Sequence, residues 1–137
     1  MRAVLDPNII VSALLSPNGA PAKTLLAWRE GEFELIASPA LLDELERVLT
    51  YPNLRRHVPP ASADAVIALL NHEGTIVANV VDPAPRWTDP DDDDLIAIAE
   101  RERAALVSGD ADVLALRGQL PVFSAGEFLE WLDGLLG

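Results

Sequence analysis

Hydrophobic positions along the chain alternate between short apolar runs, typical of buried strands, and longer stretches with helical spacing. The predicted strands are residues 3–5, 33–36, 75–81, 105–107 and 120–123. The predicted helices are residues 9–15, 21–31, 38–50, 63–70, 91–103, 112–116 and 127–136. Because strands and helices alternate with little hairpin signal, the pattern predicts an α/β fold with a mostly parallel sheet covered by helices on both faces.

The length of 137 residues predicts a single domain spanning residues 1–137. No apolar run approaches the ~18 residues of a membrane span, and Asp6 interrupts the apolar start of the chain too early for a signal peptide. We therefore expect a cytoplasmic protein without a membrane partner. The absence of cysteine excludes disulfides, thiolate metal ligands and a cysteine nucleophile.

The formal net charge of −12 argues against nucleic-acid binding, because phosphate contacts normally need clustered lysine and arginine. However, five aspartates fall within residues 89–94, and bound divalent cations would reverse the local sign. All basic residues except Lys23 are arginines, which bind phosphate in bidentate fashion. Arg55 and Arg56 are candidates for holding nucleic-acid phosphates, although two adjacent arginines are more often simply solvated.

Two carboxylates directly follow predicted strands, where parallel sheets form their ligand sites. Asp6 follows residues 3–5, and Asp110 comes shortly after residues 105–107. The aspartates of residues 89–94 begin the preceding helix and exceed what helix capping requires, so a cation among them is the simplest explanation. Oxygen ligands without nearby histidine or cysteine indicate Mg²⁺ or Mn²⁺ rather than zinc.

Helical periodicity narrows the choice of ligands only in part. In the helix at residues 91–103, Asp92 lies close to the extended buried stripe, whereas Asp93 lies well off it. In the helix at residues 38–50, Glu44 and Glu46 flank the buried stripe at similar angles. Periodicity cannot choose between these two glutamates, and either is compatible with an ordinary solvated side chain.

These segments together resemble the PIN-domain nucleases, and within them the bacterial toxin-antitoxin (VapC-like) group. The resemblance is carried by residues 4–15, 42–49, 89–99 and 106–114, in matching order and spacing. It implies a three-layer α/β/α sandwich that hydrolyses RNA with metal ions held by four acidic residues. By position, these are Asp6, Glu44, Asp92 and Asp110. The resemblance thus favours Glu44 over Glu46.

The resemblance also implies supporting positions. Asn8 and Ser12 match polar positions that support the first aspartate, and Ser108 stands where the family has threonine or serine. Asp89 and Asp112 match secondary acidic positions that would hold a second metal or its waters, and Asp93 is a further candidate ligand. One departure is Pro7, where the family usually has a small or hydroxylated residue. Proline removes a backbone N–H and stiffens the turn, so the start of the helix or its hydrogen bonds should differ.

Two other functions are compatible with parts of this pattern. A phosphotransferase with an aspartyl nucleophile needs a second acid two residues on and a downstream lysine, but position 8 is Asn and Lys23 is the only lysine. A catalytically weak or inactive metal-binding interaction module would keep the acids without turnover. The carboxylates themselves favour metal binding, and the resemblance implies a metal-dependent ribonuclease with a small antitoxin as partner and a homodimer as assembly.

Overall fold

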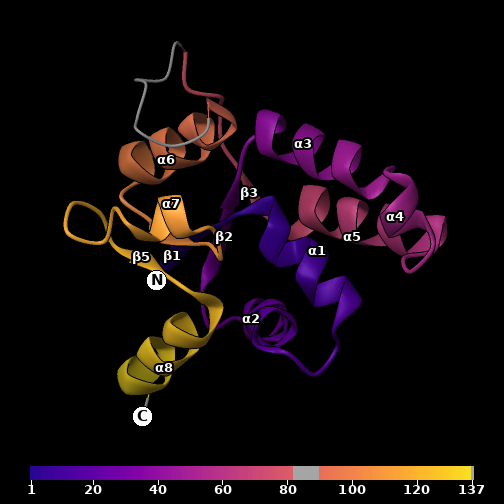
Figure 1. Ribbon diagram of the computed structural model, residues 1–137. Coiled ribbons are helices and arrows are strands. Elements are labelled where there is room, and N and C mark those ends of the chain that lie inside the picture. The colour runs from indigo at the N-terminus through magenta and orange to yellow at the C-terminus, as the bar shows by residue number, and fades with distance from the viewer. Residues whose placement is uncertain (82–89, 137) are drawn as a thin grey trace.

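Five parallel strands form the central sheet of the protein, shown in the computed structural model (Figure 1). The structure describes residues 1–81 and 90–136, and among these it describes all side chains except those of residues 90–92 and 136. The strands are β1 (Arg2–Leu5), β2 (Glu34–Ala37), β3 (Thr75–Ile76), β4 (Ala105–Val107) and β5 (Val122–Phe123). Their order in the sheet is β3-β2-β1-β4-β5, and every pairing is parallel, which confirms the predicted α/β class.

Helices cover both faces of the sheet, as the alternation of elements predicted (Figure 1). They are α1 (Pro7–Leu15), α2 (Ala20–Arg29), α3 (Pro39–Leu49), α4 (Pro52–Arg55), α5 (Pro60–Glu73), α6 (Pro90–Glu102), α7 (Ala111–Leu114) and α8 (Ala125–Leu136). The sequence did not predict α4, which is a single turn, and it placed the start of α5 three residues too late. No helix within the described ranges is both long enough and apolar enough to cross a lipid bilayer.

Two hydrophobic cores lie on opposite faces of the sheet because successive strand residues point to opposite sides. On β1, Ala3 and Leu5 belong to one core and Val4 to the other, and all three are buried. The first core contains buried residues of α1, α2, α3, α5 and α8, and the second contains residues of α6 and α7 together with Leu41 of α3. Strands buried on both faces explain why the sequence shows short continuous apolar runs in place of an apolar–polar alternation.

The predicted strand at residues 75–81 is wrong beyond Ile76, where the chain leaves the sheet. Asn79 there accepts a hydrogen bond from the backbone N–H of Ala40 at the start of α3, with a distance of 2.9 Å. Arg101 of α6 donates to the carbonyl oxygens of residues 78 and 79. Hydrogen bonds with the backbone of α3 and with the Arg101 side chain of α6 therefore hold a segment that β-propensity alone assigned to the sheet. The strand predicted at residues 120–123 is likewise shorter, beginning at Val122.

The turn between α6 and β4 is tight and uses an unusual backbone conformation. Arg103 has a φ of 53°, in the left-handed region that favours glycine. The N–H of Ala104 donates to the carbonyl of Ala99 at 3.0 Å, which closes the end of α6 in the way a glycine-terminated helix does. The turn leads from the end of α6 at Glu102 to the start of β4 at Ala105. Ala99 and Ala104, which this hydrogen bond joins, are both buried.

Candidate active site

The candidate site lies where the order of the strands reverses. The chain places β2 and β3 on one side of β1, and then crosses over to place β4 and β5 on the other. In open parallel sheets, ligands bind beyond the carboxyl ends of the two strands at such a reversal. These two strands are β1 and β4, which are paired directly and are followed by Asp6 and by Ser108–Asp110 respectively.

Asp6 is a buried carboxylate held by the turn from β1 into α1. Its side chain is 4% exposed, and its backbone N–H donates to the carbonyl of Val107 on β4 at 2.9 Å. As the N-cap of α1, its Oδ1 accepts from the N–H of Asn8 at 3.0 Å. Pro7 occupies the first helical position, where a backbone N–H has no partner within the helix and the fixed φ of proline suits the helix. The proline therefore leaves this capping bond in place.

Ser108 connects the two strand ends. It is fully buried, and its hydroxyl donates to Oδ2 of Asp6 at 2.8 Å. The hydroxyl oxygen of Ser108 also accepts from the backbone N–H of Asp110 at 3.0 Å. One hydroxyl thus links a side chain that follows β1 to a backbone that follows β4, and it fixes both acids relative to the sheet.

The environment of Asp6 disfavours its negative charge. Burial raises the pKa of Asp6, and the nearby charge of Asp110 raises it further, although the hydrogen bonds from Asn8 and Ser108 act in the opposite direction. A buried carboxylate close to a second acid gains most from a bound cation, which would compensate both the desolvation and the repulsion.

Asp110 and Asp112 follow β4, the second strand of this pair. Asp110 is half-buried and caps α7, where its Oδ1 accepts from the N–H of Asp112 at 2.8 Å. Asp112 is exposed. Asp110 therefore has a fixed orientation beside the buried Asp6, and Asp112 lies further toward solvent.

The two glutamates of α3 differ in burial, which the helical wheel could not foresee. Glu44 is half-buried, whereas Glu46 and its neighbour Asp43 are exposed. The helix begins at Ser38, whose buried side chain caps it by accepting from the N–H of Leu41. Glu44 is therefore the glutamate that faces more toward the interior of the protein.

The remaining predicted positions lie on α1, on α6 or outside the described residues. Asp89 and the side chain of Asp92 lie outside the described residues, although the backbone of Asp92 belongs to α6. Asp93 is half-buried, while Asn8 and Ser12 on α1 are exposed. Asn8 supports Asp6 through its backbone N–H rather than its side chain.

The structure joins two of the predicted acids, Asp6 and Asp110, through Ser108. No cluster of three or more acidic or histidine side chains able to hold a metal occurs among the residues it describes. The two carboxylates nevertheless fit a hard divalent cation, because they supply only oxygen donors and one of them is buried.

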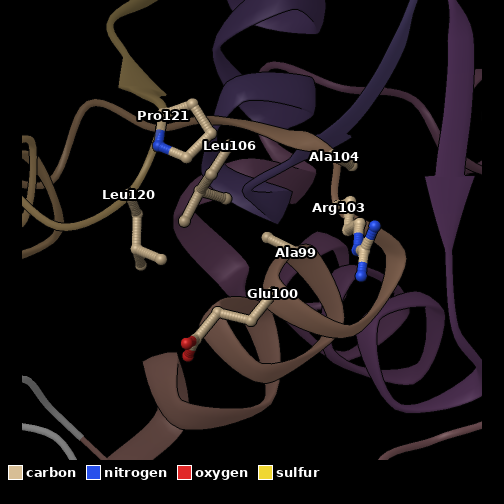
Figure 2. A pocket seen from close by; sticks show the side chains of 7 residues that line it. All are labelled: Ala99, Glu100, Arg103, Ala104, Leu106, Leu120 and Pro121. Carbon is tan, nitrogen blue, oxygen red and sulfur yellow. The ribbon is translucent and has the colours of Figure 1, made fainter.

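A separate pocket of about 330 Å³ lies between α6 and the strands β4 and β5 (Figure 2). Its walls include Ala99, Leu106 and Leu120, with Glu100 and Arg103 on opposite sides. Arg103 precedes β4 and Leu120 precedes β5, so the pocket opens toward the amino ends of these strands. None of the predicted site residues lines it, and we assign it no role in the chemistry.

Comparison with known proteins agrees with this architecture. An uncharacterized protein of Methanocaldococcus jannaschii, MJ1680, is 28% identical over 122 residues, which cover 87% of this chain and 77% of that protein. A chain in the crystal structure of VapBC2 from Rickettsia felis, bound to a DNA fragment from its promoter, superimposes with a TM-score of 0.64 at 14% identity, covering 90% of this chain and 98% of that one. A chain of VapBC-1 from nontypeable Haemophilus influenzae gives a TM-score of 0.60 at 15% identity, covering 92% of this chain and 99% of that one.

At such identities the two solved structures are similar to this protein in fold. The family model for the PIN domain matches residues 2–112, which include β1, β4 and the acids that follow them. This match covers most of the sequence, and the chain therefore belongs to the PIN-domain family.

Proposed function

We propose that this chain is a divalent-metal-dependent endoribonuclease and the toxin of a toxin-antitoxin pair. The observation that carries the proposal is the buried Asp6, tied through the Ser108 hydroxyl to the backbone of Asp110 at the reversal of strand order. Membership in the PIN-domain family supports nuclease chemistry at this position. The similarity of the fold to chains of two VapBC complexes supports a small antitoxin as partner.

Four acids would hold the metal: Asp6, Glu44, Asp92 and Asp110. A bound Mg²⁺ or Mn²⁺ ion would lower the pKa of a water and stabilise negative charge on the scissile phosphate. The hydrogen bonds from Ser108 and from the backbone of Asn8 orient both carboxylate oxygens of Asp6. Such fixed orientation reduces the reorganisation needed when a ligand binds. Asp89, Asp93 and Asp112 would contribute to a second ion or to its waters.

Cleavage of RNA by the purified chain tests the activity. We expect structured RNA to be cut with Mg²⁺ or Mn²⁺ and to remain intact in EDTA. Asp110→Asn should abolish cleavage while keeping the cap of α7, because the asparagine oxygen still accepts from Asp112. Asp43→Asn is the matched control, since it removes an exposed carboxylate from α3 and should leave the rate unchanged. Intact RNA with metal present, or full activity of Asp110→Asn, would overturn the proposal.

A pair of substitutions in α3 tests which glutamate takes part. Glu44→Gln should reduce the rate at least about 100-fold, the scale of losing a group that stabilises the transition state. Glu46→Gln, two residues away on the same helix and exposed, should cleave like the wild type. Equal rates for the two variants would remove Glu44 from the proposed set.

A metal-binding interaction module without turnover is the alternative. It would show an increase in thermal midpoint with Mn²⁺ that Asp6→Asn removes, together with intact RNA under all conditions. The oligomeric state, for which we propose a homodimer, is measured separately by sedimentation.

A further inference from the structure

The acid-free stretch with the most arginines lies between Glu46 and Asp64. Residues 47–63 contain three of the ten basic residues and no acidic one, in a chain with 22 acids. The three are Arg47 at the end of α3 and Arg55 and Arg56 at the end of α4, and all are exposed. No ion pair joins any of the three to an acid of the described residues, whereas Arg2, Arg29, Arg101 and Arg117 are all ion-paired.

An exposed aromatic side chain lies within the same stretch. Tyr51, between α3 and α4, is 48% exposed. Every phenylalanine and tryptophan side chain that the structure describes is buried or half-buried. A solvent-facing ring in the same segment as exposed arginines is a combination with which proteins hold single-stranded nucleic acid, because bases stack on the ring and phosphates pair with the guanidinium groups.

The backbone around Tyr51 is fixed. Its carbonyl accepts from the N–H groups of Leu54 and Arg55, both at 3.0 Å, which closes the single turn of α4. Val58, directly after this turn, is 2% exposed and belongs to the first hydrophobic core. Tyr51 and Arg55 are thus presented by an ordered, anchored turn.

The segment around Tyr51 adjoins α3, the helix that carries Glu44. Arg47 follows Glu44 by three residues on α3, a rise of about 4.5 Å along the helix axis, and α4 packs against the end of α3 (Figure 1). Glu46 and Asp64 line a shallow depression together with Arg55, so part of the charge of Arg55 is offset. Arg47 and Arg56 do not line this depression.

We propose that Arg47, Tyr51, Arg55 and Arg56 form a binding surface for single-stranded RNA. The proposal rests on the proposed ribonuclease function, and it explains how a chain with a net charge of −12 could bind RNA. A chain that repels nucleic acid as a whole needs a local site where phosphates meet unpaired cations. Substrate held here would pass close to Glu44.

RNA binding measured without cleavage tests this surface. The probe is a fluorescein-labelled, unstructured RNA oligonucleotide, followed by anisotropy in EDTA at several salt concentrations. The triple variant Arg47→Gln/Arg55→Gln/Arg56→Gln should flatten the slope of log K against log salt by about 2, which corresponds to about 100-fold weaker binding at ~0.1 M salt. Tyr51→Ala should weaken binding by about 5- to 150-fold, the range for loss of one stacked base.

Two matched variants serve as controls. Tyr51→Phe keeps the ring and should bind within about 2-fold of the wild type. Lys23→Gln removes an exposed cation from α2, outside the surface, and should leave the slope unchanged. Duplex RNA of the same sequence should bind more weakly than the single strand, because paired bases cannot stack on Tyr51.

Three outcomes would each overturn the proposed RNA-binding surface. They are an unchanged salt slope in the triple variant, wild-type affinity of Tyr51→Ala, and no RNA binding by the wild type. Unchanged RNA binding combined with lost binding of an acidic protein partner would assign the arginines to that partner. Failure of the nuclease proposal is distinguishable, because it appears as intact RNA with Mg²⁺ or Mn²⁺ while binding in EDTA is measured independently.

Discussion

Replacing Ser108 with alanine removes the hydrogen bond that the Ser108 hydroxyl, which follows β4, donates to the carboxylate of Asp6, which follows β1. The hydroxyl donates to Oδ2 of Asp6 at 2.8 Å and accepts from the N–H of Asp110 at 3.0 Å. Ser108 and Asp6 are 0% and 4% exposed, so water does not readily replace the lost contacts. Among the described residues, Ser108→Ala therefore leaves the buried carboxylate of Asp6 with one donor, the N–H of Asn8.

The size of the effect follows from the charge on the acceptor. A hydrogen bond to a charged group contributes about 1.5–3 kcal/mol, so we expect a loss of about 2 kcal/mol in the free energy of unfolding in EDTA near neutral pH. For a chain of 137 residues this corresponds to a fall of about 7 °C in Tm. The variant also loses an interaction that favours the ionised form, so the pKa of Asp6 should rise further.

Urea unfolding in EDTA and titration with Mn²⁺ measure the two consequences. Besides the lost stability, Ser108→Ala should bind Mn²⁺ about 10- to 100-fold more weakly, as is usual when a partner of a metal ligand is removed. Ser38→Ala is the matched control, because Ser38 is also fully buried but caps α3 through the N–H of Leu41. It should lose about 1 kcal/mol and keep its metal affinity. If Ser108→Ala behaves like Ser38→Ala in both measurements, Ser108 has no role in orienting Asp6.

Three further predictions concern single positions. Burial raises the pKa of Asp6 in the folded protein above the ordinary 3.8, so ionisation of Asp6 lowers the free energy of unfolding as pH rises from that value. Asp6→Asn should therefore be more stable than the wild type in EDTA at neutral pH. In urea unfolding this difference should become smaller toward pH 4. Arg103→Gly should raise Tm by about 2–4 °C, since glycine adopts the φ of 53° without strain, while Arg103→Ala should not, and calorimetry distinguishes the two. Asn79→Ala should cost about 1 kcal/mol in chemical unfolding, because the N–H of Ala40 at the start of α3 loses its acceptor; an unchanged midpoint would show that water replaces Asn79 there.

The sequence predicted most of the elements of this fold because they depend on local patterns. Strands buried on both faces appear as short apolar runs, and Ser38 followed by proline marks the start of α3. The prediction was wrong for residues 77–81, whose β-branched side chains favour a strand. The N–H of Val77 still donates to Ala37 of β2, but contacts from Ala40 and Arg101 hold residues 78 and 79 outside the sheet. Such contacts join residues 22 or more positions apart, and no local pattern reveals them.

The candidate site was predictable to a similar degree. Asp6 and Asp110 could be placed because the carboxyl ends of parallel strands meet at one edge of the sheet. The side-by-side pairing of β1 and β4 depends on strand order, which the sequence does not display, and it is this pairing that lets Ser108 reach Asp6. Glu44 and Glu46 were indistinguishable on the helical wheel because their burial depends on what packs beside α3. The exposure of Tyr51 likewise depends on how α4 folds against α3.

The position of β1 in the middle of the sheet has a consequence for the order in which the protein is made. The ribosome synthesises β1 first, yet one of its two neighbours, β4, begins only at Ala105. Until β4 emerges, β1 has an open edge, and Asp6 lacks the hydroxyl of a serine 102 positions further along the chain. A nascent or truncated chain ending before β4 therefore cannot assemble the candidate site. If the proposed ribonuclease activity is present, it should therefore appear only in chains that extend past Asp110.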